Sequence, residues 1–206
     1  MEILKPGLVV VKDFFSNYDE ILNYVYLSGE DPESKVRWER ARVDKRERED
    51  QKPNRGKEVD HRTNSIVPIH PMFQDAENKS YNALGQIAVN TYNHLIPQID
   101  HYKNIYPLSA ATKTVPKSYN FLKYQLGQEY KIHDDFSVIN KRAISFLVYI
   151  NDDYEGGHLE FPYLGLKIKP EKNSLIIFPS NFLFGHIAHP VTSGTKYAVV
   201  NWIEWA

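Results

Sequence analysis

The feature that most constrains this chain is the order of its hydrophobic patterns, because helical patterns come first and strand patterns follow. Five short segments rich in β-branched and aromatic residues, separated by Gly, Pro, Asn and Asp, lie at residues 121–126, 143–151, 164–168, 174–178 and 196–205. Helical patterns do not alternate with these segments, so a βαβ arrangement is not indicated. We predict an α+β fold: a double-stranded β-helix (jelly roll) braced by N-terminal helices.

Two helices are expected before the strands. An apolar strand over residues 8–15 is followed by Ser16, a potential helix cap, and then by apolar residues at helical spacing: Ile21, Leu22, Val25 and Tyr26. The second helix is expected to begin at Ser80 and to end at Pro97. Its apolar face is formed by Leu84, Ile87, Ala88, Thr91 and Leu95.

The length of 206 residues, of which 42% are hydrophobic, fits one domain with a substantial core. We predict a single domain over residues 1–206, with helical support in 1–117 and the catalytic jelly-roll core in 118–206. Within the support, residues 31–58 hold ten basic and eight acidic side chains. Two interpretations stay open for this mobile segment, a flap over the substrate and a solvated loop without a role.

Composition excludes several classes of site. The chain has no cysteine, so a transition metal must be bound by His and carboxylate. The formal net charge of −1 argues against a nucleic-acid partner. The N-terminal residues lack the pattern of a signal peptide, and no apolar run has the roughly 20 residues needed to span a membrane. We therefore expect a soluble, cytoplasmic enzyme without a membrane partner.

Two pairs of residues have the spacing of a metal site on a strand. Side chains at positions i and i+2 of a strand point the same way, so His133 and Asp135 can bind one ion together. With eight histidines in the chain, a lone match of this kind is weak evidence. His158 and Glu160 have the same spacing and compete for the role.

A third ligand would favour one of these pairs. His186 is followed ten residues later by Lys196, at the start of the last predicted strand. In a jelly roll both side chains can face the interior, with a metal ion near the histidine and an anion near the lysine. His189 is an alternative third ligand, although the backbone before Pro190 is restricted.

Five motifs in order resemble the prolyl 4-hydroxylase branch of the 2-oxoglutarate/iron(II)-dependent oxygenases. The resemblance covers roughly residues 118–205, and a weaker echo extends to Arg62-Thr63-Asn64-Ser65. The motifs are Tyr124-Gln-Leu-Gly127-Gln-Glu-Tyr130-Lys-Ile-His133-Asp-Asp135, Tyr149-Ile150-Asn151, Gly156-Gly157-His158-Leu159, His186 with Pro190-Val191, and Gly194-Thr195-Lys196 with Trp202. His158 stands at the variable position of its motif, which favours His133, Asp135 and His186 as the metal ligands.

The resemblance implies iron(II) as cofactor and 2-oxoglutarate as cosubstrate, with ascorbate open as an accessory. It implies that Lys196 neutralises the distal carboxylate of 2-oxoglutarate, where the family often has Arg. Tyr149 is then the expected hydroxyl partner of the cosubstrate, and Tyr124 matches a family tyrosine near it. Trp202 shares strand parity with Lys196 and is expected to form a pocket wall.

The expected activity is a dioxygenase reaction that uses dioxygen and 2-oxoglutarate to hydroxylate a prolyl residue in a peptide or protein, with release of succinate and CO2. Two alternatives stay open. The same chemistry could act on a free amino acid, a small metabolite or a nucleobase. A jelly roll that binds a metal without catalysis would require only the three ligands, and not Lys196 or Tyr149.

Overall fold

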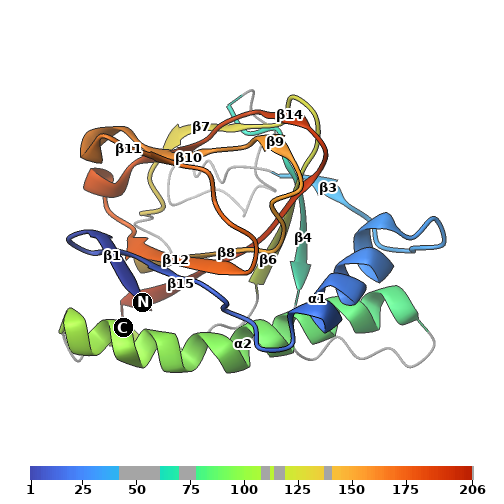
Figure 1. Ribbon diagram of the computed structural model, residues 1–206, viewed down its shortest axis with the longest axis horizontal. Helices are drawn as coiled ribbons and strands as arrows, with labels where there is room; N and C mark the ends of the chain where they lie inside the picture. The colour runs from blue at the N-terminus through green and yellow to red at the C-terminus, as the bar shows by residue number, and fades with distance from the viewer. Residues whose placement is uncertain (42–60, 70–77, 108–111, 114–118, 137–140, 206) are drawn as a thin grey trace, which may run out of the picture.

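The computed structural model describes residues 1–41, 61–69, 78–107, 112–113, 119–136 and 141–205. Within these ranges a large antiparallel sheet has the strand order β1-β2-β12-β8-β15-β6-β4-β3, with β5 paired to β15. A second sheet has the order β11-β10-β13-β7, and β14 pairs with β9. The two larger sheets face each other in Figure 1, with the second sheet above the first.

The strands and helices have the following bounds. The large sheet contains β1 (Glu2–Lys5), β2 (Leu8–Val11), β3 (Glu39–Arg40), β4 (Ser65–Ile69), β5 (Thr112–Lys113), β6 (Tyr119–Tyr124), β8 (Arg142–Tyr149), β12 (Ser174–Pro179) and β15 (Lys196–Trp205). The others are β7 (Tyr130–His133), β9 (Glu155–Gly156), β10 (Leu159–Phe161), β11 (Leu166–Ile168), β13 (His186–Ala188) and β14 (Val191–Ser193). The helices are α1 (Tyr18–Val25), the π-helical η1 (Tyr26–Glu30), α2 (Lys79–Ile105), and the 3₁₀ turns η2 (Pro162–Leu164) and η3 (Phe182–Phe184).

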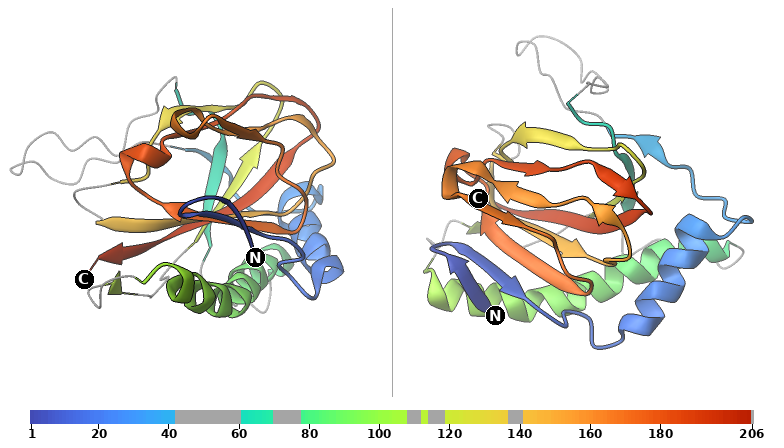
Figure 2. Two further views of the ribbon diagram at one scale, coloured as in Figure 1. Left: turned by 60° about the vertical axis from the view of Figure 1, so that its left-hand side comes forward. Right: turned by 45° about the horizontal axis from the view of Figure 1, so that its top comes forward.

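Two hydrophobic cores lie on opposite faces of the large sheet. Side chains that alternate along β8 separate them: Phe146 and Val148 pack with the helices, whereas Leu147 and Tyr149 face the second sheet. Helix α2 runs beneath the large sheet in Figure 1, and both views of Figure 2 keep it on that side. This arrangement confirms the predicted jelly roll with helical support.

The predicted helix boundaries need correction. Asn17, not Ser16, is the N-cap residue of α1, and Leu22 and Tyr26 are exposed, not on its buried face. Asn78, not Ser80, caps α2, because its side chain accepts the backbone N–H groups of Ser80 and Tyr81. The five residues predicted for the apolar face of α2 are all buried.

Pro97 does not end α2, which continues to Ile105. Pro97 lies on the exposed side of the helix, where water can hydrate the carbonyl group that its missing N–H leaves unpaired. On the opposite side Leu95, Ile99 and Tyr102 stay buried, so core packing carries the helix past the proline.

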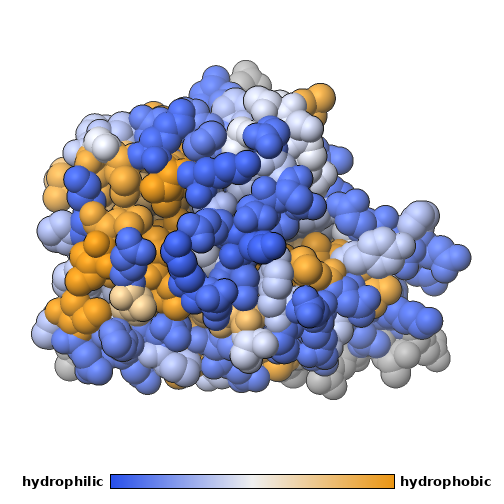
Figure 3. Space-filling view, viewed as in Figure 1, coloured by the Kyte–Doolittle hydropathy of each residue, from blue (hydrophilic) through white to orange (hydrophobic). Residues whose placement is uncertain are grey.

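Part of the charged segment 31–58 is ordered against the large sheet. β3 pairs with β4 at the sheet edge, and the ring of Trp38 lies 5.3 Å from that of Phe121. Residues 42–58 of this segment lie outside the described residues. Figure 3 shows hydrophobic side chains gathered toward the end of the molecule where β1 and β11 lie.

Among the described helices, none combines the length and apolar character that crossing a bilayer requires.

Candidate active site

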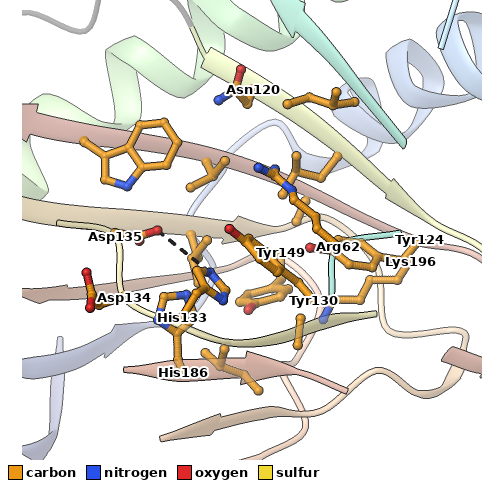
Figure 4. Close-up of a pocket in the computed structure, with 18 of the residues that line it drawn as sticks. Arg62, Asn120, Tyr124, Tyr130, His133, Asp134, Asp135, Tyr149, His186 and Lys196 are labelled. Carbon is orange, nitrogen blue, oxygen red and sulfur yellow. Dashed lines mark ion pairs between the residues drawn. The ribbon is translucent and has the colours of Figure 1, made fainter. Parts of the chain in front are cut away.

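A pocket of about 340 Å³ opens between the two sheets. Its walls come from β6, β7, β8, β13 and β15, so the jelly roll itself positions the side chains. The charged and polar side chains that line it are Arg62, Asn120, Tyr124, Tyr130, His133, Asp134, Asp135, Arg142, Tyr149, His186, Lys196 and Trp202. Figure 4 shows His133, Asp135 and His186 together on one side of the pocket, with Lys196 farther along it.

His133, Asp135 and His186 each offer a ligand atom, and the three atoms lie within 4.8 Å of one another. His133 ends β7 and Asp135 follows two residues later, while His186 begins β13, which pairs with β7 at His133. The Nε2 atom of His133 lies 3.9 Å from Oδ1 of Asp135. In the part of the chain that the structure describes, no other set of three such residues forms a comparable group.

Backbone contacts orient both imidazole rings. Nδ1 of His133 lies 2.8 Å from the carbonyl oxygen of Lys131, and Nδ1 of His186 lies 3.1 Å from that of Phe184. A carbonyl only accepts hydrogen bonds, so each ring donates from Nδ1, and Nε2 is the atom that each ring offers to a metal ion. Burial, together with the neighbouring His186, lowers the pKa of His133 to about 3, which holds this ring neutral as a metal ligand must be.

The Asp135 carboxylate is fixed by a chain of two hydroxyl groups. Ser145 on β8 donates from Oγ to Oδ2 of Asp135 at 2.6 Å, and Oγ of Ser180 lies 2.9 Å from Oγ of Ser145. All three side chains are buried. Burial acts to raise the pKa of Asp135, but the two histidines and the Ser145 hydroxyl outweigh it, so the pKa lies below its ordinary value. Oδ1 remains directed at the histidines.

Two of the alternative ligands, His189 and Glu160, contact each other. Nε2 of His189 lies 2.5 Å from Oε2 of Glu160, and the backbone N–H of His189 donates to the carbonyl of His158. None of the three lines the pocket. The geometry therefore favours His186 over His189, and the His133–Asp135 pair over His158 and Glu160.

Lys196 is a cation buried among aromatic rings. Its side chain is 2% exposed, and Nζ donates to the carbonyl oxygen of Gly157 at 2.6 Å. Nζ lies 4.9 Å from the ring centre of Tyr149, 5.4 Å from that of Tyr124 and 5.7 Å from that of Tyr154. The negative faces of aromatic rings stabilise an ammonium group, so these three tyrosines form a cage for it.

Burial lowers the pKa of Lys196 to about 7. Desolvation is the cause, because the ammonium group is removed from water and the cage supplies no carboxylate. Burial also raises the pKa of Tyr124 to about 12 and raises the pKa of Tyr149 well above its ordinary value, so both phenols stay protonated. At the Lys196 end of the pocket, an anion would find a buried cation and neutral hydroxyl groups.

Glycine is required where the backbone meets this cage. Gly157 has a φ of +60°, and a Cβ there would lie 2.7 Å from the ring of Tyr154 and 3.3 Å from Cδ of Lys196. Any side chain at this position would displace the cage, which gives the Gly-Gly motif a physical reason.

Sequence reasoning missed several residues around the site. Arg142 places its guanidinium 3.5 Å from the ring centre of Trp202, and Tyr130 stacks on His133 with ring centres 3.4 Å apart. Ser145 and Ser180 were missed too, as was Tyr154. Alternation along β8 places Ser145 on the pocket side, so its parity was a usable signal. The pairing of Ser180 with Ser145 depends on tertiary structure and leaves no signal in the sequence.

Part of the chain is similar to known proteins. Residues 119–204 match the model of the 2OG-Fe(II) oxygenase superfamily. A probable prolyl 4-hydroxylase from Arabidopsis thaliana is 35% identical over 119 residues, covering 43% of this chain and 41% of that protein. A PKHD-type hydroxylase from Synechococcus sp. is 36% identical over 86 residues, covering 39% and 38%. The chain thus spans about two fifths of the length of these relatives.

Solved structures share the fold. A Trichoplax adhaerens prolyl hydroxylase, in complex with a hypoxia inducible factor peptide fragment, superposes with a TM-score of 0.67 at 19% identity, over 96% of this chain and 83% of that one. A Pseudomonas putida prolyl-4-hydroxylase superposes with a TM-score of 0.64 at 18% identity, over 97% and 93%. Residues 119–204 are thus similar to the 2OG-Fe(II) oxygenase superfamily, whose name points to iron(II) and 2-oxoglutarate, and they contain the His-Asp-His group.

Proposed function

We propose that this protein is an iron(II)- and 2-oxoglutarate-dependent dioxygenase that hydroxylates a prolyl residue in a peptide or protein. One observation carries the proposal: a His-Asp-His group lines the same pocket as a buried lysine that has no carboxylate partner among the described residues. We further propose that residues 1–206 act as one domain, with 118–206 as the catalytic core and 1–117 as its support.

His133, Asp135 and His186 are suited to hold the iron. Two imidazoles and one carboxylate on one side of a pocket leave the other coordination positions of the ion open. The two Nδ1–carbonyl contacts and the Ser145 hydrogen bond fix the orientation of all three ligands without the metal. The residues present therefore fit an iron(II) ion.

Lys196 is suited to bind the distal carboxylate of 2-oxoglutarate. A buried ammonium forms a charge-assisted hydrogen bond with a carboxylate, and the anion offsets the cost of burying the cation. Tyr149 and Tyr124 would each offer a phenolic O–H beside Lys196. Trp202 lines the same pocket at the other end of β15, where it would act as a wall.

Iron(II), 2-oxoglutarate and dioxygen together supply the oxidation that inserts one oxygen atom into a C–H bond, while 2-oxoglutarate becomes succinate and CO2. The protein's part is to hold, orient and shield. Ser145 and Ser180 hold Asp135, the tyrosine cage excludes water from Lys196, and the two sheets enclose the reacting groups. Ascorbate would act as an accessory reductant, tested by omitting it during repeated turnover.

The prolyl substrate is supported by the names of the relatives, which are prolyl 4-hydroxylases and PKHD-type hydroxylases. A small-molecule substrate is the alternative, since the described lining does not itself require a peptide. The lysine and its cage argue against a metal-binding protein without catalysis, because metal binding alone gives a buried cation no role.

The test is to incubate the iron(II)-loaded protein with 2-oxoglutarate, dioxygen and proline-rich peptides, and to search by mass spectrometry for a gain of one oxygen atom. We expect the modification on proline, with one succinate formed per oxygen inserted. Replacing proline by alanine should abolish it. Oxygen incorporation into a small metabolite, and into none of the peptides, would refute the prolyl proposal but leave the oxygenase chemistry intact.

A further inference from the structure

Lys196 is held in place both through its backbone and through the rings around its side chain. Asn151 fixes the backbone, because its Nδ2 donates to the carbonyl oxygen of Thr195 at 2.7 Å and its Oδ1 accepts the N–H of Tyr197 at 2.8 Å. These two contacts lie on either side of Lys196 in the chain. With the backbone fixed, the position of the ammonium group depends on how the lysine side chain is packed.

The three tyrosines of the cage differ in their relation to the pocket. Tyr149 and Tyr124 line it together with Lys196, whereas Tyr154 does not. Tyr154 is 2% exposed, and its ring centre lies 5.7 Å from Nζ of Lys196. The ring therefore lies against the lysine from outside the cavity, and it fills space into which the lysine side chain would otherwise withdraw.

Tyr154 is itself tightly packed. A Cβ added at Gly194, two residues before Lys196, would lie 3.1 Å from Cα of Tyr154, and a Cβ added at Gly157 would lie 2.7 Å from its ring. Nζ of Lys169 donates to the carbonyl oxygen of Tyr154 at 2.7 Å. Because both the backbone and the ring of Tyr154 are held, the ring can act as a fixed stop for Lys196.

The contribution of Tyr154 comes from its ring and not from its hydroxyl group. The hydroxyl oxygen is buried and has no hydrogen-bond partner among the described residues. Burial raises the pKa of Tyr154, so the hydroxyl group stays protonated and supplies no charge to the lysine. The ring supplies the bulk that blocks Lys196 and a negative face that stabilises its ammonium group.

We propose that Tyr154 is a positioning residue that fixes how far Lys196 reaches into the pocket and thereby selects the length of the 2-oxo dicarboxylic acid that binds. The inference rests on the proposed function, in which such an acid is held between the metal ligands and Lys196. With both ends of the site fixed, an acid of one length fits best. Oxaloacetate, one methylene shorter than 2-oxoglutarate, would not reach the ammonium group, and 2-oxoadipate, one methylene longer, would require the lysine to withdraw.

The experiment compares these three acids. Binding of oxaloacetate, 2-oxoglutarate and 2-oxoadipate to the iron(II)-loaded protein is measured by calorimetry without oxygen, so that no turnover occurs. A single methylene changes the affinity for a fitted pocket by about 10- to 200-fold. We therefore expect the wild type to bind 2-oxoglutarate at least about tenfold tighter than either of the other acids.

Variants of Tyr154 locate the selection. Tyr154→Leu removes the ring and leaves space behind Lys196, so 2-oxoadipate should bind within about threefold of 2-oxoglutarate, whereas oxaloacetate should stay at least about tenfold weaker. Tyr154→Phe keeps the ring and should keep both preferences. Tyr102→Leu makes the same exchange at an equally buried tyrosine of α2, on the opposite face of the large sheet, and should also keep both preferences.

Asn151 provides a second route to the same effect. Asn151→Ala releases the backbone on both sides of Lys196 while the rings of the cage stay in place. This variant should also lower the preference for 2-oxoglutarate over 2-oxoadipate, and it decides the test if Tyr154→Leu does not fold.

The outcomes separate this inference from the proposed function. The inference is overturned, and the proposed function stands, if Tyr154→Leu keeps the wild-type preferences or weakens the binding of all three acids equally. The same holds if Tyr154→Phe loses the preference that Tyr154→Leu loses, or if the wild type binds all three acids with similar affinity. Wild-type protein that binds none of the three acids overturns both the inference and the proposed function.

Discussion

At the scale of single residues, the two oxygens of the Asp135 carboxylate have different tasks. Ser145 occupies Oδ2, and Oδ1 faces the histidines. Removing the Ser145 hydroxyl leaves Oδ2 buried without this donor and lets the carboxylate rotate. We predict that Ser145→Ala weakens iron(II) binding roughly 10- to 100-fold, measured by anaerobic titration.

Two further variants distinguish this role from general destabilisation. Ser145→Thr keeps the hydroxyl and should retain most of the metal affinity. Ser174 on the neighbouring strand β12 is equally buried, but its hydroxyl donates to the backbone of Glu171, so Ser174→Ala should bind metal normally. Equal metal affinity in Ser145→Ala and Ser174→Ala would contradict the prediction.

Lys196 should make 2-oxoglutarate binding depend on protons. Its pKa of about 7 in the free protein means that the side chain is largely neutral at pH 8, whereas a bound carboxylate favours the charged form. We predict that binding at pH 8 takes up close to one proton, measured by calorimetry in buffers of different ionisation enthalpy. In Lys196→Arg the guanidinium stays charged, so the uptake should vanish.

The same pKa affects stability with a definite sign. In the unfolded chain Lys196 titrates near its ordinary pKa of 10.5, so between about pH 7 and 10.5 the unfolded state holds a proton that the folded state has lost. This lysine therefore makes the unliganded protein more stable as the pH rises through that window. In the binding experiment at pH 8, a proton uptake in Lys196→Arg as large as in the wild type would contradict the assignment of the titrating group to Lys196.

At this scale, the sequence predicted the site residues that can be recognised from their spacing within one short segment. The i, i+2 spacing of His133 and Asp135 and the shared strand parity of Lys196 and Trp202 are properties of short segments, and the structure brings these side chains to one pocket. Ser145 lies on the predicted strand 143–151 and Arg142 lies just before it, yet their partners Asp135 and Trp202 come from other segments. Contacts of that kind depend on register between strands, which spacing along one strand does not define.

At the scale of elements, α2 shows a proline tolerated inside a long helix. Core packing on one side outweighs the lost hydrogen bond on the other, which is why the sequence signal placed the helix end too early. We predict that Pro97→Ala raises the free energy of unfolding by about 2 kcal/mol, because alanine restores the N–H and has a higher helix propensity. Denaturant titration measures the change.

His101→Ala, also at an exposed position of α2, provides the matched control and should change the stability much less. Metal binding should be unaffected in both variants, since α2 lies on the face of the large sheet opposite the pocket. A Pro97→Ala protein that is no more stable than the wild type would show that the proline costs the helix nothing.

One observed strand begins two residues later than predicted. The segment expected at 164–168 begins as the 3₁₀ turn η2, and β11 starts only at Leu166, because Gly165 adopts a left-handed conformation between them. The last strand was predicted with the bounds it has, Lys196–Trp205. Long segments with clear turn residues at their ends were predicted best, and short edge strands least well.

At the scale of the whole molecule, the large sheet separates two functions. One face packs on α1 and α2 and forms the larger core, and the other forms a second core with the pocket. The order of helical and strand patterns predicted a jelly roll braced by helices, and side chains that alternate along β8 give each face of the sheet its own core. The strand order of the sheets was not predictable, since it depends on which distant segments pair.

The measurement that tests the account most directly is oxygen-dependent formation of succinate from 2-oxoglutarate by the iron(II)-loaded protein. We predict that the wild type forms succinate only with iron(II) and dioxygen. His186→Ala should reduce the rate at least about a hundredfold through loss of the metal, whereas His189→Ala should retain it. Succinate formation that persists in His186→Ala, or that is lost in His189→Ala and kept in His186→Ala, would contradict the assignment of the site.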